Sequence, residues 1–157
     1  MATSAIRKYP IGIQSFEKLR RGQYIYVDKT NLVYQLATAG NPCFLSRPRR
    51  FGKSLLLSTF EAYFLGKKEL FTGLAVEQLE TEWAVHPVFH LDLNAERYDS
   101  VEELDNMLES QLSRWEQTYG ITQPNRSISI RFMDVIREAS VQTGRGVVVL
   151  IDEYDKP

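Results

Sequence analysis

Apolar residues recur at helical spacing in five parts of this chain, and each part ends near a glycine. A short helical turn is expected over residues 15–21, and longer helices are expected after Asp28, Lys53 and Ser100 and around residues 132–139. The stop signals are Gly22, Gly40, Gly66, Gly120 and Gly144. Ser100 begins a capping-box pattern, and Asp28 can cap the helix that follows it.

Three apolar runs between these helices have the character of strands. Residues 43–46 form a short run that leads into a loop, and residues 88–93 alternate between apolar and polar positions. Residues 147–151 are the most hydrophobic run of the chain and do not alternate. Such a strand is normally covered by helices on both faces, as in a parallel sheet. The pattern therefore predicts an α/β fold in which helices flank a parallel sheet.

The composition is that of an ordinary globular protein. The chain has 157 residues, of which 43% are hydrophobic and 25% are charged, and this length fits one domain with its own core. With 19 Lys and Arg against 20 Asp and Glu, the net charge is −1. The electrostatic field of the chain as a whole therefore does not favour binding to nucleic acid or to an anionic membrane, and any basic site must be local.

Several classes of protein are excluded by what the sequence lacks. The single Cys43 excludes an intrachain disulfide framework and a cysteine-based zinc cluster within this chain. Residues 1–25 carry charges without an apolar stretch between them, and no run of about 18 apolar residues occurs, so neither a secretory signal nor a membrane helix is expected. His86 and His90 have no partner at metal-ligand spacing and are expected to be structural. These features favour a cytoplasmic protein.

The loop before the second long helix ends in Gly52, Lys53 and Ser54. A P-loop is written G-x-x-x-x-G-K-[ST]: its backbone N–H groups surround phosphates, its Lys reaches the β- and γ-phosphates, and its hydroxyl binds Mg²⁺. Arg47 stands where the first glycine belongs, so the pattern is incomplete at one end. Because the bare tripeptide is common by chance, the loop needs independent support.

That support comes from the end of the most hydrophobic strand, where Asp152 and Glu153 follow. An apolar strand that delivers an Asp at its carboxyl end is the Walker-B arrangement, in which the Asp helps to hold Mg²⁺. Ligands of open α/β sheets bind beyond the carboxyl ends of the strands, where both loops would open. Glu153 is placed to polarise an attacking water. The two patterns together predict a nucleotide site.

Each candidate residue also has a structural interpretation. Lys53 could be a solvated residue at a helix start, and Ser54 or Asp152 could be a simple cap. A local positive patch consists of Arg47, Arg49 and Arg50. These arginines could surround a triphosphate, contact a neighbouring subunit, or pair with surface carboxylates.

Six stretches carry recognisable motifs: YPIG at residues 9–12, YVDKT at 26–30, FLSRPRRFGKS at 44–54, LFTGL at 70–74, PV at 87–88 and LIDEYDKP at 150–157. With these motifs the chain resembles the bacterial AAA-ATPase-like family along nearly its whole length. Members of that family commonly join an AAA-type P-loop domain to a C-terminal nuclease-like domain of the PD-(D/E)XK type. In that family an arginine in place of the first P-loop glycine is normal.

The resemblance implies an AAA-type P-loop core with the sheet order 5-1-4-3-2. Strands 1, 2 and 3 would be residues 43–46, 88–93 and 147–151. Residues 1–157 are then expected to be the N-terminal part of one such domain, truncated after the Walker-B strand, with an N-terminal arm and helix over 1–41 and the P-loop to Walker-B part over 42–157. Strands 4 and 5, the sensor residues, any arginine finger and the nuclease-like domain would lie beyond residue 157.

The resemblance also implies ATP and Mg²⁺ as ligands and ATP hydrolysis as the activity of the intact protein. The expected nucleotide contacts are Arg47, Pro48, Arg49, Arg50, Phe51, Gly52, Lys53, Ser54 and Leu55. Lys53 and Glu153 are the expected catalytic residues, and Ser54 and Asp152 are the expected magnesium ligands. Residues 9–12 are a candidate adenine contact.

Three other functions stay open at this point. The protein could be a non-hydrolysing nucleotide sensor that regulates a nuclease-like partner domain, or the chain could be an inactive truncated fragment. It could also be a nucleic-acid-binding module that uses the arginine patch, although the net charge of −1 speaks against this. An oligomer is compatible with the sequence, and no residue decides between ATP and GTP.

Overall fold

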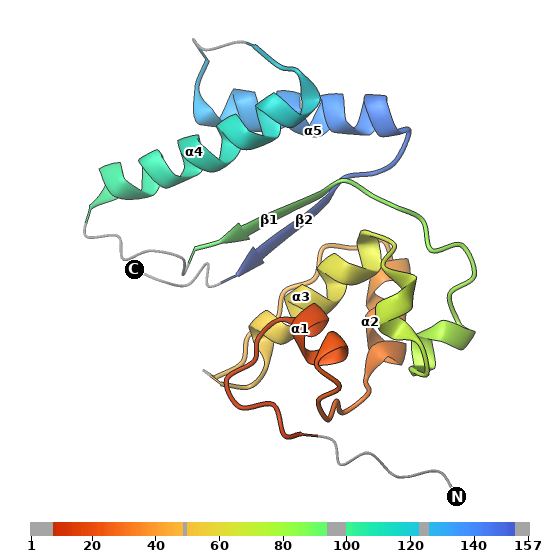
Figure 1. The fold of residues 1–157 in the computed structure, drawn as a ribbon. Helices are drawn as coiled ribbons and strands as arrows, with labels where there is room; N and C mark the ends of the chain where they lie inside the picture. The colour runs from red at the N-terminus through yellow and green to blue at the C-terminus, as the bar shows by residue number, and fades with distance from the viewer. Residues whose placement is uncertain (1–7, 49, 94–99, 123–125, 153–157) are drawn as a thin grey trace, which may run out of the picture. The chain divides into compact units, whose positions relative to one another are not determined.

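The computed structural model describes residues 8–48, 50–93, 100–122 and 126–152. The chain divides into two compact units, unit 1 over residues 1–85 and unit 2 over residues 86–157. The described part of unit 1 is helical, whereas unit 2 combines a pair of strands with two helices (Figure 1).

Unit 1 contains three α-helices and two short 3-10 helices among its described residues. They are α1 (Phe16–Arg21), α2 (Thr30–Thr38), α3 (Lys53–Phe64), η1 (Lys68–Phe71) and η2 (Ala75–Gln78). The predicted helices after Asp28 and Lys53 are therefore confirmed. Gly40 and Gly66 follow their last turns with φ angles of 68° and 66°, which is the backbone conformation that stops a helix.

Aromatic rings fill the core of unit 1. Phe16 and Phe71 are fully buried, and their ring centroids lie 4.8 Å apart. Trp83 packs on Phe71 with a centroid distance of 5.1 Å. The other buried members are Val33, Ala62, Tyr63, Leu70, Leu74 and Val76. Because these residues come from all five helices, the cluster joins every element of the unit.

Two polar side chains at the start of α2 hold the turn that leads into η2. One carboxylate oxygen of Asp28 accepts hydrogen bonds from the Thr30 N–H at 2.9 Å and the Thr30 hydroxyl at 2.7 Å, and the other accepts from the Ala75 N–H at 2.7 Å. The buried Thr30 hydroxyl accepts from the Val76 N–H at 3.1 Å. Asp28 thus binds the first N–H of α2 as expected, although Lys29 occupies the cap position. The YVDKT stretch thus holds the start of η2, directly after the LFTGL stretch.

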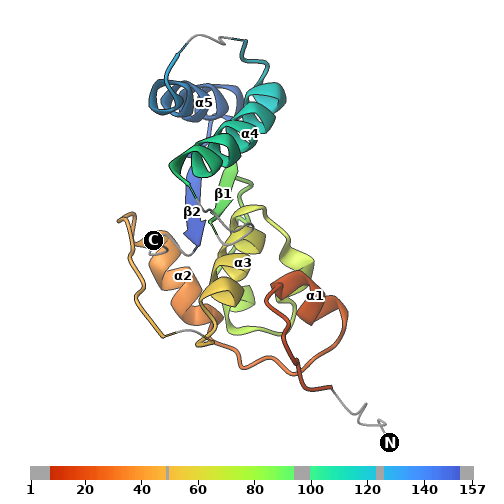
Figure 2. The same cartoon turned by 90° about the vertical axis from the view of Figure 1, so that its left-hand side faces the viewer.

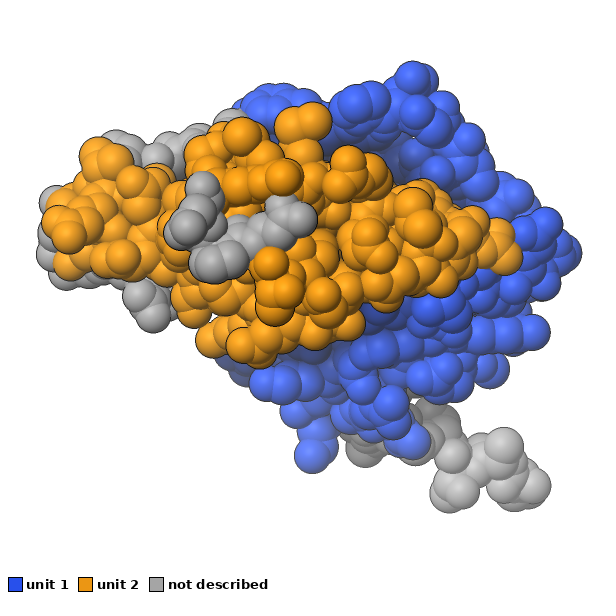
Figure 3. All heavy atoms as spheres, turned by 90° about the horizontal axis from the view of Figure 1, so that it is seen from above, with its two compact units in different colours: residues 1–85 blue, residues 86–157 orange. Residues whose placement is uncertain are grey.

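The described part of unit 2, which Figure 3 colours separately from unit 1, holds a parallel strand pair and two helices. Its elements are β1 (Val88–Asp92), α4 (Val101–Tyr119), α5 (Ile128–Thr143) and β2 (Val148–Asp152). The parallel register pairs Val88 with Val148 and Asp92 with Asp152. Both helices lie on the same side of the strands (Figures 1 and 2). The predicted α/β class with a parallel sheet beside helices is confirmed for this pair.

Phe89 of β1 is the centre of the unit 2 core. It is 1% exposed, and its ring stacks on Trp115 of α4 at a centroid distance of 4.6 Å. The other buried members are Leu112, Val135 and Ala139. The Ser100 hydroxyl accepts the Glu103 N–H at 3.2 Å, which confirms the predicted N-cap of α4.

The predicted strand over residues 43–46 is wrong. These residues are exposed and have no regular structure, and the sheet of the described residues consists of β1 and β2 alone. A strand persists when a neighbour satisfies its backbone N–H and C=O groups. In the expected sheet order the neighbours of this segment are strands 4 and 5, to which no residue up to 157 was assigned. The pairing expected for strands 2 and 3, by contrast, is observed as β1 beside β2.

A buried ion pair joins α4 and α5. The Arg131 guanidinium donates hydrogen bonds to both carboxylate oxygens of Glu116, each at 2.8 Å, and a further one to Glu109 at 3.0 Å. Arg131 is 7% exposed and Glu116 is 9% exposed. The hydrogen bonds with Glu116 and then Glu109 raise the pKa of Arg131 above its ordinary value, so the pair stays charged.

We expect Arg131→Met to destabilise the protein by about 3–5 kcal/mol, because Glu116 would stay buried without a partner. Combining Arg131→Met with Glu116→Leu should restore most of that loss, since a well-packed apolar pair can replace a buried ion pair. Urea denaturation followed by tryptophan fluorescence measures both free energies of unfolding. An Arg131→Met protein as stable as the unaltered one would contradict this account.

Two carboxylates of unit 1 make its stability sensitive to acid. Burial raises the pKa of Asp28, but the hydrogen bonds from Thr30 and Ala75 outweigh burial and hold it below its ordinary value. Burial likewise raises the pKa of Glu80, and the Tyr63 hydroxyl with nearby backbone N–H groups lowers it by more. A depressed folded-state pKa stabilises the protein above the unfolded-state pKa, and this contribution is lost as the pH falls through the folded-state value.

We therefore expect the urea midpoint of unfolding to fall as the pH drops below about 4, where unfolded aspartate and glutamate begin to take up protons. Asp28→Asn should be less stable near neutral pH and should lose less of its stability between about pH 5 and pH 3. Urea titrations across this range measure both effects. A variant with the same pH dependence as the unaltered protein would exclude Asp28 as a source.

Candidate functional site

The start of α3 is preceded by a left-handed turn. Gly52 has a φ of 77° and stands directly before Lys53, the first residue of the helix. A Cβ added to Gly52 would meet no atom within 4 Å. Glycine is therefore required here for its backbone angle, and the space beside it is open.

The N-cap residue of α3 is Gly52, which supplies no side-chain hydrogen bond to the first turn of the helix. N–H groups in the first turn of a helix lack partners within the helix and carry a partial positive charge. In α3 they belong to Lys53, Ser54 and Leu55, three of the predicted nucleotide contacts. A helix end of this kind suits an anion, and phosphate in particular.

Arg50 adds a second left-handed residue, with a φ of 69°. An L-amino acid in this conformation costs about 1–2 kcal/mol, so the loop carries backbone strain that glycine would avoid. With Arg50 and Gly52 both left-handed, the chain turns sharply ahead of the helix. Backbone turns that include left-handed residues can gather successive N–H groups into a concave anion site.

Most side chains of the predicted loop face solvent. The exposed ones are Arg47, Pro48, Arg50 and Phe51, and Phe51 is 64% exposed. Neither Arg47 nor Arg50 forms an ion pair with another described residue. Arg49 lies outside the described residues. Two exposed cations thus stand within a few residues of the open helix end.

The residues after the turn are less exposed than those before it. Lys53 and Ser54 are partly buried in the first turn of α3, and Leu55 packs against the core of unit 1. A cation at a helix N-terminus opposes the helix dipole unless an anion lies between them. The loop residues are thus brought together within unit 1 around one helix end.

The predicted magnesium ligand Asp152 belongs to unit 2. It is the last residue of β2 and is 6% exposed. A buried carboxylate costs free energy unless it is paired, hydrogen-bonded or bound to a metal. Glu153, the predicted catalytic base, lies outside the described residues.

Sequence reasoning did not count Asp92 as a site residue. It ends β1 and pairs with Asp152 in the parallel register, so both strands of unit 2 deliver a carboxylate at the same end of the sheet. The signal in the sequence was a strand pattern that ends in Asp at both places. Within the described residues, no group of three or more potential metal ligands of the His, Cys, Asp and Glu types is found.

The two histidines lie just before β1 and within it. The His86 Nδ1 lies 2.9 Å from the carbonyl oxygen of Gly146, a contact between the segments that enter β1 and β2. His90 lies within β1, opposite Leu150.

None of the described helices is both long enough and apolar enough to cross a membrane.

Comparison with known proteins gives two matches. The model of a family described as "Predicted AAA-ATPase" matches residues 10–157. The "Uncharacterized protein in vnfD 5'region" of Azotobacter chroococcum mcd 1 is 44% identical over 153 residues, which are 96% of this chain and 30% of that protein. The chain therefore spans less than a third of the length of this curated relative. No solved structure matches.

The strain at Arg50 gives a prediction for stability. Arg50→Gly should stabilise the protein by about 0.5–1 kcal/mol, because glycine adopts a positive φ without steric cost. Arg50→Ala is the matched control: it removes the same guanidinium but keeps a Cβ and its strain. Thermal unfolding of the two variants isolates the backbone effect. If Arg50→Gly melts no higher than Arg50→Ala, the left-handed conformation of residue 50 is not a source of strain.

Proposed function

This chain belongs to the AAA-ATPase-like family, and we propose that the intact protein binds ATP with Mg²⁺ and hydrolyses it. The observation that carries the proposal is the open N-terminus of α3, which follows left-handed Gly52 and begins with Lys53. Gly52 supplies no side-chain cap to this helix end, and the dipole of the helix favours a negative charge there.

In this proposal the loop holds the phosphate chain. The N–H groups around Gly52 and Lys53 bind phosphate oxygens, and the Lys53 ammonium reaches the β- and γ-phosphates. The exposed Arg47 and Arg50 add positive charge beside a ligand with several negative charges. Pro48, Arg49, Phe51 and Leu55 complete the set of proposed nucleotide contacts.

Mg²⁺ would be held by the Ser54 hydroxyl and the Asp152 carboxylate. Both groups fit the ion, because Mg²⁺ binds oxygen ligands and is usually held by few protein groups together with phosphate oxygens. When bound, the ion supplies neutralising charge to the phosphate chain. Glu153 is proposed to orient and deprotonate the attacking water.

The domain assignment is part of the same proposal. Residues 1–157 are proposed to be part of one P-loop domain, although they form two compact units as described. The parallel pairing of β1 with β2 supports this, because strands 3 and 2 are neighbours in the order 5-1-4-3-2. Since the chain covers 30% of its curated relative, the activity and partners of the whole protein are proposals.

Two substitutions in the full-length protein separate binding from hydrolysis. Lys53→Ala should weaken ATP binding at least about 10-fold, because it removes the cation from the phosphate chain, whereas Lys68→Ala, at an exposed residue of η1, is the matched control. Glu153→Gln should bind ATP normally and lose phosphate release, because the amide cannot take a proton. Titration with a fluorescent ATP analogue and a phosphate-release assay measure these effects.

Unchanged affinity in Lys53→Ala would overturn the nucleotide site. Equal phosphate release by the unaltered protein and Glu153→Gln would remove the catalytic role of Glu153. If neither protein released phosphate above background while both bound ATP, the function would be nucleotide sensing without hydrolysis.

A further inference from the structure

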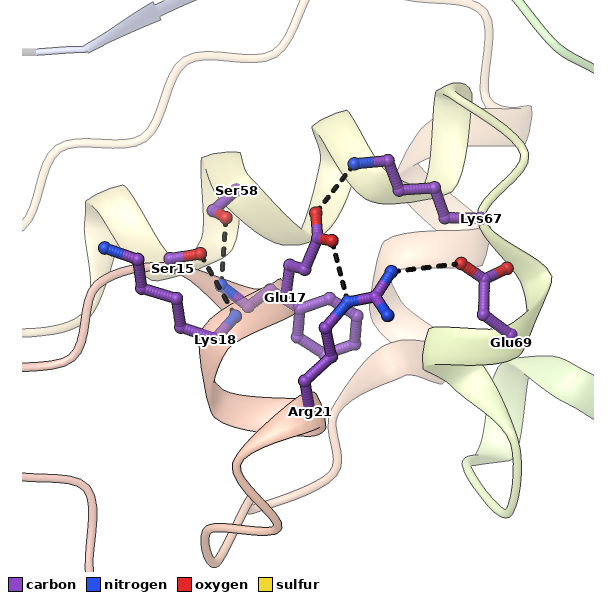
Figure 4. A network of polar contacts seen from close by, with 8 residues as sticks. Ser15, Glu17, Lys18, Arg21, Ser58, Lys67 and Glu69 are labelled. Carbon is purple, nitrogen blue, oxygen red and sulfur yellow. Dashed lines mark hydrogen bonds and ion pairs between the residues drawn. The ribbon is translucent and has the colours of Figure 1, made fainter.

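The helix that carries the loop is fastened to α1 by a hydrogen bond in its middle. The Phe16 N–H, at the start of α1, donates to the Ser58 hydroxyl of α3 at 2.9 Å (Figure 4). Phe16 is fully buried, so its N–H has no access to bulk water and depends on this acceptor. The Ser15 hydroxyl accepts the Lys18 N–H at 3.3 Å and caps α1 separately.

The next residue of α3 lies in the same buried region. Thr59 is 1% exposed, and its hydroxyl donates to the Leu55 carbonyl at 2.8 Å, within α3. Burial raises the pKa of Tyr26, and the Thr59 side chain lowers it by less. The Tyr26 ring packs edge-on against Phe16 at a centroid distance of 5.3 Å. The Ser58–Phe16 hydrogen bond is therefore surrounded by buried and aromatic side chains.

These contacts reach the first turn of α3. Leu55, whose carbonyl accepts from Thr59, lies in the same turn as Lys53 and Ser54. A helix is stiff over this length, so its rotation about its own axis sets the directions of the N–H groups and side chains in that turn. The ion pair between Lys67 and Glu17, beyond the other end of α3, constrains the rotation of the helix less. The two side chains meet at 2.7 Å but are 36% and 37% exposed (Figure 4).

We propose that Ser58 is a positioning residue for the phosphate loop, because its hydroxyl accepts the buried Phe16 N–H and so fixes the rotation of α3 against α1. The inference rests on the proposed nucleotide function of residues 47–55. In this proposal the Ser58 hydroxyl makes no contact with the ligand. It acts by holding the N–H groups and the Lys53 and Ser54 side chains in the direction that a phosphate chain requires, which a binding site must keep within a fraction of an ångström.

The test compares ATP affinity with thermal stability in the full-length protein. Ser58→Ala should weaken binding of a fluorescent ATP analogue by about 10-fold at a temperature well below the unfolding midpoint, since small misplacements of a site carry large effects. Ser58→Thr keeps a hydroxyl at this position and should bind within about twofold of the unaltered protein. Lys67→Met is the matched control, which removes an α1 contact of the same region and should leave affinity unchanged.

Ser58→Cys provides a second, milder variant in case Ser58→Ala does not fold. Its thiol is a weaker acceptor for the Phe16 N–H, and it should also weaken ATP binding several-fold. A lower melting temperature with unchanged affinity in both Ser58→Ala and Ser58→Cys would overturn the proposal and leave this contact a purely structural role. Unchanged affinity in Lys53→Ala would instead overturn the nucleotide site itself, and the positioning role with it.

Discussion

The left-handed entry into α3 is the constraint on which the proposed site depends. The N-cap residue Gly52 supplies no side-chain hydrogen bond to the first turn, and the chain reaches it through left-handed Arg50. Open helix ends and strained backbone persist only where the surrounding structure holds them. Here the holding comes from the side of α3 that faces α1, where the Ser58 hydroxyl accepts the Phe16 N–H, and from Tyr63 in the aromatic core.

Unit 2 depends on a different interaction, because an isolated pair of strands is only marginally stable unless other elements pack against it. Phe89 provides the anchor: its ring stacks on Trp115 and lies beside Tyr119 at a centroid distance of 6.0 Å, so α4 covers β1. The Arg131–Glu116 pair then fixes how α5 lies along α4. A buried ion pair of this kind adds little net stability compared with apolar packing, but a shifted pairing of the helices would leave both charges unsatisfied.

Local signals explain how much of the fold could be predicted. Ser100 and Gly120 bracket α4, and Gly52 and Gly66 bracket α3, because caps and left-handed stops act within a few residues. The prediction of a strand over residues 43–46 was wrong because a strand needs a neighbouring strand to pair with, which an apolar run alone cannot supply.

The long-range polar contacts were out of reach for a related reason. The Thr30–Val76 and Phe16–Ser58 hydrogen bonds join residues more than 40 positions apart, and no spacing rule connects them. The residues of the proposed nucleotide loop could be predicted because their types and order alone indicate phosphate binding. The strained angle of Arg50, by contrast, is a property of the folded backbone, which its residue type did not suggest.

The net charge of −1 does not show where charges are balanced. Lys67 pairs with Glu17 and Arg131 pairs with Glu116, whereas Arg47 and Arg50 pair with no carboxylate of a described residue. Because charges within about 10 Å act on the same ligand before salt screens them, a nearly neutral chain can still present a strongly cationic loop to a phosphate chain.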